Sequence, residues 1–156
     1  MPSQDYTLAF TVERSPEEVY AAVTDVRGWW SEGLEGRSEA AGDHFTYRHG
    51  DLHLSTHRVT EALPGRRVTW LTVAADLPHA DPSDEWVGTE VRFEITPGRR
   101  GTELRFTHAG LTPALACYRS CARGWAFYVG ESLRALIATG RGKPDPAPAA
   151  SAGASP

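Results

Sequence analysis

The sequence predicts an α+β fold in which a curved antiparallel sheet of about six to seven strands wraps around one long C-terminal helix. Residues 6–13 alternate between apolar and polar side chains, which is typical of a strand with one buried face. Residues 33–109 carry only strand and turn signals, whereas residues 112–140 carry apolar side chains at helical spacing. Because the apolar face of such a sheet must be covered, and the helix is the only element long enough to cover it, we expect the two to pack together.

The first strand is followed by a helix with a clear start signal. Ser15 is placed to cap the helix, Pro16 suits its first position, and Glu18 completes a capping box. The amphipathic pattern ends near Asp25, so this helix is short. Residues 28–30, Gly-Trp-Trp, then predict a second short helical turn or a loop.

The middle of the chain reads as a series of strands joined by tight turns. The predicted strands cover residues 34–38, 44–49, 52–62, 67–73, 86–96 and 102–108. The last two form the clearest hairpin, because a Pro-Gly-Arg-Arg-Gly turn at 97–101 joins two alternating arms. The predicted buried face of this hairpin consists of Val91, Phe93, Ile95, Leu104, Phe106 and His108. The acidic segment 76–85 contains two prolines and predicts a mobile loop.

The strand predicted over residues 52–62 contains a conflict. If Val59 faces inward, every second residue back to His53 does so too, and the apolar Leu54 faces outward. A bulge near residues 55–56 would let Leu54 and Val59 both point inward. On a strand, His53 and His57 are separated by about 13 Å, at ~3.3 Å per residue, so they do not bind one metal ion together.

The long helix is predicted to begin at Thr112 and to end at Gly140, with a length of roughly 40 Å at 1.5 Å per residue. Its apolar face contains Leu115, Tyr118, Cys121, Ala122, Trp125, Tyr128, Val129, Leu133, Leu136 and Ile137. Phe127 falls on the opposite, charged side, so we expect it to pack under the early helices or against a dimer partner. Gly124 and Gly130 cost the helix ~1 kcal/mol each relative to Ala, and they indicate a close approach or a bend.

The sequence after Gly140 is rich in Pro, Ala, Ser and Gly, which predicts one domain over residues 1–140 and a disordered tail over 141–156. A net charge of −4 argues against a nucleic-acid partner. We find no signal peptide and no apolar stretch of the ~20 residues that cross a membrane, so we expect a cytoplasmic protein. Cys117 and Cys121 are too few to hold zinc and are poorly spaced for a disulfide, so we expect neither a metal nor a cofactor.

Three segments, in this order, resemble the helix-grip fold of the START-like superfamily, which is also called SRPBCC or Bet v-like. They are SPEEVYAAVTDVRGWWSEG, HRVTEALPGRRVTWLTV, and GTEVRFEITPGRRGTELRFTHAGL followed by GWAFYVGESLRALI. Within the superfamily they look like the activator of heat shock protein 90 ATPase homologue 1-like family. The resemblance covers about residues 6–140.

The resemblance implies an elongated cavity between the sheet and the long helix. The superfamily includes lipid carriers, plant hormone receptors, aromatic polyketide cyclases and co-chaperone domains, so the fold alone does not select a function. We therefore keep three alternatives. They are a binding protein for a small apolar or aromatic molecule, a chaperone-associated interaction module, and an enzyme similar to polyketide cyclases or aromatases.

The aromatic side chains expected to face the helix favour the binding protein over the enzyme, although such rings also fill ordinary cores. Tyr and Trp combine an apolar body with a polar tip, which suits a cavity that orients a ligand. The predicted ligand-binding residues are Trp29, Trp30, Tyr47, His57, Trp70, Phe93, His108, Tyr118, Cys121, Trp125 and Tyr128. For an enzyme, His108 could act with Tyr118 or Tyr128, or as the base for Cys121. We assign no catalytic residue, and we expect a monomer or a homodimer.

Overall fold

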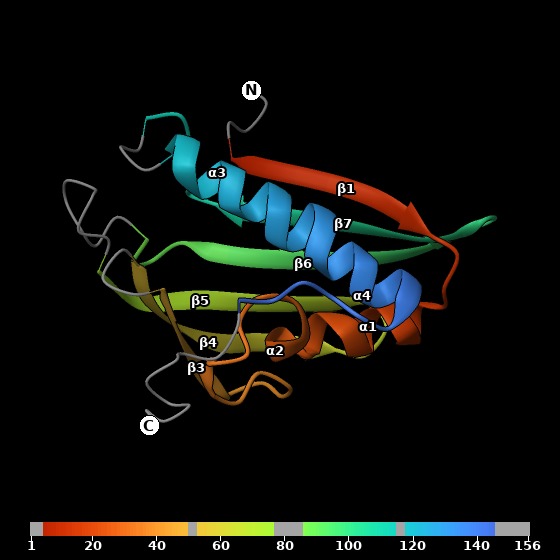
Figure 1. Ribbon diagram of the computed structural model, residues 1–156, viewed down its shortest axis with the longest axis horizontal. Helices are drawn as coiled ribbons and strands as arrows, with labels where there is room; N and C mark the ends of the chain where they lie inside the picture. The colour runs from red at the N-terminus through yellow and green to blue at the C-terminus, as the bar shows by residue number, and fades with distance from the viewer. Residues whose placement is uncertain (1–4, 50–52, 77–85, 115–117, 146–156) are drawn as a thin grey trace.

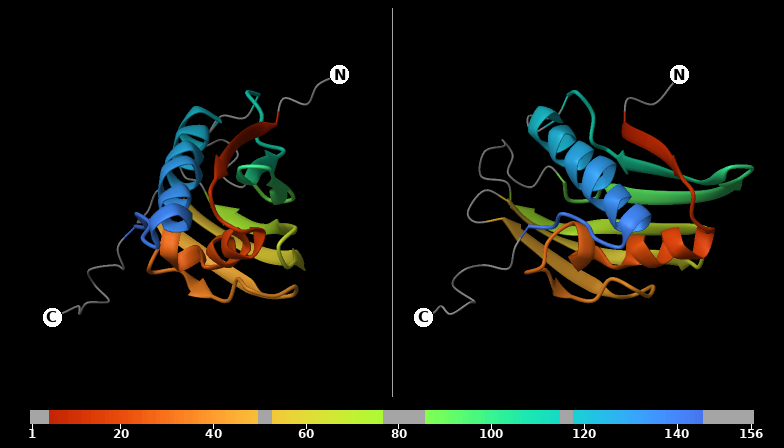
Figure 2. Two further views of the ribbon diagram at one scale, coloured as in Figure 1. Left: turned by 90° about the vertical axis from the view of Figure 1, so that its right-hand side faces the viewer. Right: turned by 45° about the vertical axis from the view of Figure 1, so that its right-hand side comes forward.

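The structure is a computed structural model that describes residues 5–49, 53–76, 86–114 and 118–145, and it confirms the predicted fold. An antiparallel sheet curves around the long C-terminal helix, which lies across one face of the sheet (Figures 1 and 2). The strand order in the sheet is β1-β7-β6-β5-β4-β3-β2. The strands are β1 (Tyr6–Val12), β2 (Glu35–Gly36), β3 (His44–His49), β4 (His53–Leu63), β5 (Arg67–Asp76), β6 (Glu90–Gly98) and β7 (Gly101–Ala109).

Two short helices, α1 (Pro16–Thr24) and α2 (Val26–Trp29), follow β1 as predicted. The capping box is confirmed, because Ser15 Oγ accepts from the backbone N–H of Glu18 at 3.1 Å and Glu18 Oε1 accepts from the N–H of Ser15 at 2.9 Å. Both helices lie on the same face of the sheet as the long helix (Figure 1). This placement brings the Trp29-Trp30 pair into the interior of the fold.

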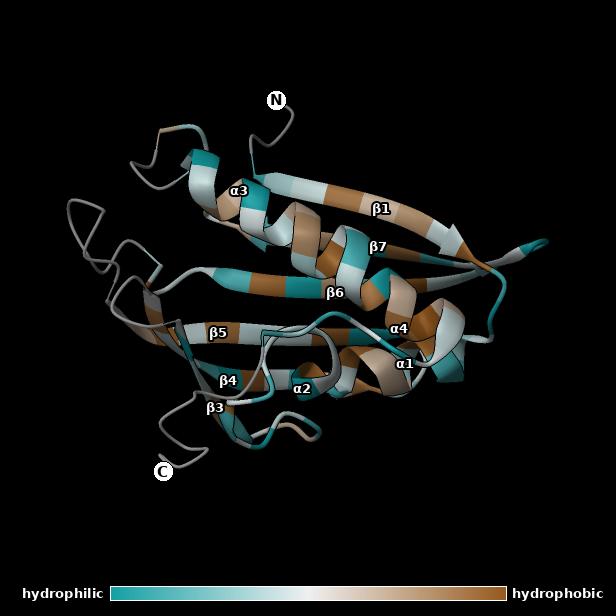
Figure 3. Ribbon diagram, viewed as in Figure 1, coloured by the Kyte–Doolittle hydropathy of each residue, from teal (hydrophilic) through white to brown (hydrophobic). Residues whose placement is uncertain are grey.

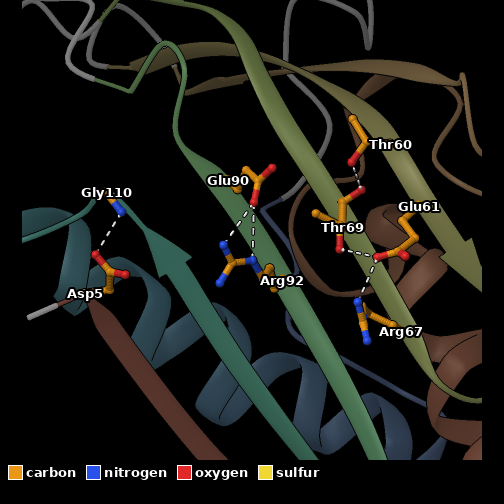
Figure 4. Close-up of polar contacts among 8 residues, drawn as sticks. All are labelled: Asp5, Thr60, Glu61, Arg67, Thr69, Glu90, Arg92 and Gly110. Atoms are coloured by element: carbon orange, nitrogen blue, oxygen red, sulfur yellow. Dashed lines mark hydrogen bonds and ion pairs between the residues drawn. The ribbon is translucent and has the colours of Figure 1, made fainter. Parts of the chain in front are cut away.

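The hairpin of β6 and β7 alternates as predicted. Its apolar side chains are buried under the helix, and bands of opposite hydropathy alternate along the strands (Figure 3). The other face carries charged pairs such as Arg92 with Glu90 at 3.1 Å and Arg67 with Glu61 at 3.3 Å (Figure 4). Because these pairs are solvent-exposed, each adds at most about 1 kcal/mol, and the face they form is an ordinary solvated surface.

Strand β4 corrects one prediction. Ser55, His57 and Val59 are all buried, so the simple alternation holds here and Leu54 lies half-buried on the opposite face. The register with β5 shifts between Thr56 and His57, beside the position considered for a bulge, but the extra residue is Val73 of β5; a second shift follows Val59. The alternative in which Leu54 points inward is therefore wrong, and hydrogen bonds with Ser55 and Thr72 allow a polar histidine to occupy the inner face.

The long helix is continuous from Tyr118 to Thr139 and has three parts, α3 (Tyr118–Phe127), the π-helix η1 (Tyr128–Leu133) and α4 (Arg134–Thr139). Gly140 ends it in the left-handed conformation, with φ of 85°, as predicted. The predicted start at Thr112 is wrong, because residues 112–114 are not helical. Backbone hydrogen bonds of Leu111 with β1 and β7 hold the chain to the sheet up to that point.

The spacing of the buried residues in the long helix explains the π-helix. Trp125, Val129, Leu133 and Ile137 are all buried and lie four residues apart. In an α-helix, four residues advance by about 400°, so such a row would drift roughly 40° at each step. A π turn holds more residues than an α turn, which keeps this row facing the sheet. Gly130, for which the sequence predicted a bend or close approach, lies inside η1.

Residues 141–145 correct the predicted start of the disordered tail, and we call this segment the C-terminal strap. It runs beside α2, where the backbone N–H of Asp145 donates to the carbonyl of Trp30 at 2.9 Å. Gly142 passes so close to the carbonyl oxygen of Gly28 that a Cβ would collide with it. Hydrogen bonds of the strap backbone and of the Asp145 side chain hold it in place, so no apolar pattern in the sequence predicted it.

The prediction that Phe127 packs under the early helices is also wrong. Its side chain is 37% exposed, and its ring lies 5.3 Å from that of Tyr128 rather than under α1 and α2. Of the mobile loop predicted over residues 76–85, Asp76 ends β5, and the remaining residues, like Cys117 and the tail beyond residue 145, lie outside the described residues. Within the described ranges, no helix is long and apolar enough to cross a membrane.

Candidate functional site

Aromatic rings occupy the space between the inner face of the sheet and the long helix. We call the following set the aromatic cluster: Trp29, Trp30, Phe45, Tyr47, Trp70, Trp86, Phe93, Phe106, Trp125 and Tyr128. His57 and His108 lie among these rings and are both fully buried. Of the predicted ligand-binding residues, Tyr118 and Cys121 make none of these ring contacts, and they pack half-buried against the core.

Three indoles of the aromatic cluster lie nearly parallel. Trp30 and Trp70 are inclined by 5° with ring centroids 6.0 Å apart, and Trp29 is inclined to them by 13° and 10°. Two of these rings come from the end of α2 and the third from β5. The arrangement forms a layer of offset, parallel aromatic faces inside the fold.

Trp30 connects this layer to the helix. Its ring stacks on Tyr47 at 4.3 Å and lies 4.9 Å from Trp125. The Trp-Trp pair at the end of α2 therefore touches both walls of the interior, the sheet through Tyr47 and the helix through Trp125.

The neighbours of His108 select one tautomer of its imidazole ring. The indole Nε1 of Trp125 donates to His108 Nδ1 at 3.0 Å, and an indole nitrogen can only donate, so Nδ1 carries no proton. The proton is then on Nε2, which lies 2.8 Å from Thr89 Oγ1. The Thr89 hydroxyl donates in turn to the backbone carbonyl of Trp86 at 2.6 Å. Every donor in this series of hydrogen bonds has one acceptor, and the imidazole of His108 is neutral.

This arrangement argues against the catalytic pairs considered from the sequence. A general base needs a free nitrogen lone pair, but the basic nitrogen of His108 already accepts from Trp125. His108 therefore has no lone pair to offer to Tyr118, Tyr128 or Cys121.

His57 has a different environment. Its Nε2 lies 2.9 Å from Ser55 Oγ, and its Nδ1 lies 3.0 Å from Thr72 Oγ1. Hydroxyl groups donate or accept, so these partners fit either neutral tautomer of the ring and also the protonated form. The rings of Phe45 and Trp70 lie 5.2 Å and 5.7 Å away. His57 is thus a buried polar group whose hydrogen-bonding state is adjustable.

A third polar group links the helix to the strap. Tyr47 Oη donates to Asp145 Oδ2 at 2.7 Å, and Tyr128 Oη donates to Asp145 Oδ1 at 2.8 Å. Burial raises the pKa of Tyr128 to about 12, and burial raises the pKa of Tyr47 well above its usual range. Both phenols are therefore neutral hydrogen-bond donors at physiological pH.

Trp86 and Asp145 belong to this site but were not predicted from the sequence. Trp86 was predicted to begin a strand, but it lies in a turn before β6 and stacks on Trp125 at 5.7 Å. Asp145 follows a segment without any apolar pattern, so no local signal marked it. In the described residues, no three His, Cys, Asp or Glu side chains are grouped so that they could hold a metal ion.

Comparison with known proteins gives one family and one fold. The family model described as "Activator of Hsp90 ATPase homolog 1-like protein" matches residues 13–138. The solution structure of an Aha1 dimer from Colwellia psychrerythraea is similar with a TM-score of 0.71 and 25% identity, covering 88% of this chain and 98% of that chain. No match was found among curated proteins.

Two further solved structures are similar in fold. Protein MLL2253 from Mesorhizobium loti has a TM-score of 0.66 and 21% identity, over 81% of this chain and 91% of that chain. CalU16 from Micromonospora echinospora has a TM-score of 0.61 and 18% identity, over 85% of this chain and 74% of that chain.

Proposed function

The chain belongs to the activator of Hsp90 ATPase homolog 1-like family, and from this premise we propose that it binds a small apolar or aromatic molecule between its sheet and its long helix. The observation that carries the proposal is the composition of the interior. Trp29, Trp30, Trp70 and Trp125 are each at most 2% exposed and lie within one connected set of rings. Large rings with polar tips suit a site that holds an apolar body and orients it.

The polar groups of the interior support an orienting role. His57 offers nitrogen atoms whose protons can be rearranged, because the hydroxyl groups of Ser55 and Thr72 lie against them. Tyr47 and Tyr128 present phenol groups that stay protonated, since burial raises the pKa of each. A ligand with an apolar ring system and one polar edge would match these surroundings. The proposal includes no catalytic step.

Thermal unfolding in the presence of planar aromatic compounds tests the proposal. A compound present at 100 times its Kd adds about 2.7 kcal/mol to the free energy of unfolding. For a domain of this size, that raises the unfolding midpoint by roughly 5–10 °C. If no compound of this class raises the midpoint, the proposal is wrong for planar aromatic ligands.

Two variants locate the binding. Trp30→Phe replaces the indole that contacts both walls of the interior with a smaller phenyl ring, so it should reduce or abolish the thermal shift. Phe127→Ala changes an exposed aromatic residue of the same helix and should leave the shift unchanged. A shift that Phe127→Ala abolishes and Trp30→Phe preserves would place the compound on the outer surface instead.

Interaction with a heat shock protein 90 chaperone is a second candidate, favoured by the family to which the chain belongs. Such an interaction would use the outer surface of the protein, so Trp30→Phe should leave it unchanged. Phe127→Ala is then the variant expected to weaken the effect. The measurement is ATP hydrolysis by the purified chaperone with and without this protein, and an unchanged rate contradicts the candidate.

A further inference from the structure

Trp70 lies at the centre of the aromatic cluster with an unusual feature at its indole nitrogen. The side chain is 0% exposed, and β5 places it in register with Val59 of β4 and Val91 of β6. Among the described residues, Nε1 of Trp70 has no hydrogen-bond acceptor. A buried N–H without an acceptor is unfavourable and uncommon in folded proteins, so this nitrogen calls for an explanation.

Two neighbouring indoles of the cluster, Trp29 and Trp125, do not share this feature. Trp29 Nε1 donates to the backbone carbonyl of Val23 at 3.2 Å. Trp125 Nε1 donates to His108 Nδ1 at 3.0 Å. The fold therefore supplies acceptors to the buried indoles of Trp29 and Trp125 but supplies none to Trp70 among the described residues.

The side chains around Trp70 cannot supply the missing acceptor. Its ring neighbours Trp29, Trp30, Phe45 and Phe93 present aromatic carbon and indole N–H groups. His57 lies 5.7 Å away between ring centroids, but both of its nitrogens are hydrogen-bonded to the hydroxyls of β4 and β5.

We infer that the molecule bound in the aromatic cluster carries an acceptor oxygen, such as the carbonyl of an aromatic ketone, which accepts a hydrogen bond from Trp70 Nε1. The inference rests on the proposed function and names the chemical class of its ligand. The parallel indoles select a flat ring system, and Trp70 selects an oxygen at its edge. A plain hydrocarbon of the same shape leaves the indole N–H without an acceptor and binds more weakly.

A matched pair of probes tests the inference on the full chain. 9-Fluorenone and fluorene share one ring skeleton and differ by a carbonyl in place of a methylene group. The carbonyl makes fluorenone better hydrated, so a purely apolar site would favour fluorene. By titration calorimetry, we expect the wild type to bind fluorenone roughly five- to tenfold more tightly than fluorene.

An isosteric replacement isolates the indole N–H. β-(3-Benzothienyl)alanine has sulfur in place of N–H and nearly the same shape as tryptophan. Introduced in place of Trp70, it should abolish the preference for fluorenone. The same replacement of Trp29 is the matched control, because the Trp29 N–H is already bonded to Val23, and the preference should persist.

Unfolding of the ligand-free protein separates a ligand from an ordered water as the acceptor. If Trp70 Nε1 has no acceptor without ligand, the benzothienyl replacement leaves the unfolding midpoint unchanged or raises it. At Trp29, the same replacement lowers the midpoint, because the Val23 carbonyl loses its donor. A lowered midpoint for the Trp70 replacement would indicate a bound water and overturn the inference.

The outcomes also distinguish the inference from the proposed function. Equal binding of both probes, or tighter binding of fluorene, overturns the inference and leaves the proposed function standing. If neither probe binds, the proposed function fails for planar aromatic compounds and the inference fails with it.

Discussion

The long helix is hydrogen-bonded to the sheet on both sides, and the two attachments differ in charge. On one side, Trp125 of α3 donates to His108 on β7, the neighbour of edge strand β1. On the other side, Tyr128 of η1 meets Tyr47 on β3, the neighbour of edge strand β2. The first attachment consists of neutral groups, whereas the second converges on the carboxylate of Asp145.

This difference indicates on which side of the interior the hydrogen bonds can respond to a change of protonation. Around His108, each donor has one acceptor, so any change of protonation would break a hydrogen bond. At Asp145, two phenols share one carboxylate, and that carboxylate belongs to the C-terminal strap rather than to the sheet or the helix. We therefore expect the hydrogen bonds of His108 to be rigid and insensitive to pH, and those of Asp145 to respond to pH and to changes in the strap.

The largest effect is expected at the neutral attachment. His108→Leu leaves the buried N–H of Trp125 without an acceptor and the hydroxyl of Thr89 without its donor, so it should lower the free energy of unfolding by about 3 kcal/mol. Urea denaturation measures the change. His44→Leu, at an exposed side chain of β3, is the control and should stay within about 0.5 kcal/mol of wild type. A loss below about 1 kcal/mol for His108→Leu would mean that this attachment is not rigid.

A smaller effect is expected at the charged attachment. Asp145→Asn keeps the backbone bonds of the strap but replaces a charged acceptor of two phenols with a neutral amide, so it should cost about 1–2 kcal/mol. The exposed Glu131→Gln in η1 is the matched control. If both variants have the same stability by urea denaturation, the phenols gain nothing from the carboxylate.

The pH dependence of stability separates the two attachments further. Burial raises the pKa of Tyr128 to about 12 in the folded state, above its ordinary value of about 10 in the unfolded state. Between pH 10 and 12 the unfolded state loses a proton that the folded state keeps, so the free energy of unfolding should fall as pH rises.

Urea denaturation across that pH range measures the slope. Tyr128→Phe should show a shallower decline than wild type, because it removes a phenol whose pKa is raised in the folded state. Thr89→Val, which weakens the neutral attachment, should lower stability by a similar amount at every pH. Parallel curves for wild type and Tyr128→Phe would contradict the assignment of the pH response to this side.

The smallest effect concerns the protons on the two buried histidines. Nitrogen-15 NMR at neutral pH should show His108 in a single tautomer with its proton on Nε2, since Trp125 donates to Nδ1. His57 should show a population of both tautomers or exchange between them, because its partners Ser55 and Thr72 are both hydroxyls. A mixture of tautomers at His108 would remove the basis for calling its side of the helix rigid.

Most of the fold could be predicted from the sequence because its signals are local. Three examples each depend on residues close together in the sequence: the capping box at Ser15, the alternation of β6 and β7, and the helix stop at Gly140. The start of the long helix was placed too early, because the hydrogen bonds that hold Leu111 to the sheet join distant segments. The π-helix has a local signal in the four-residue spacing of buried side chains from Trp125 to Ile137.

The candidate site was predicted in its apolar part and missed in its polar part. Alternation along the strands and spacing along the helix place Trp70, Phe93 and Trp125 on inner faces, and the structure has all three buried there. Apart from Ser55 on the same strand, the partners of His57 and His108 come from a neighbouring strand, the segment before β6 and the helix, so the sequence gave no indication of them.

The sequence by itself determined the order of the elements and which side of each is buried, because both follow from the local periodicity of apolar side chains. Only the tertiary structure decided how the polar groups of the interior are paired. It gave His108 a donor that sets its tautomer, joined Tyr47 and Tyr128 through Asp145, and left Trp70 Nε1 without an acceptor among the described residues. Hydrogen bonds require specific distances and directions between segments far apart in the chain, and a one-dimensional pattern contains no such information.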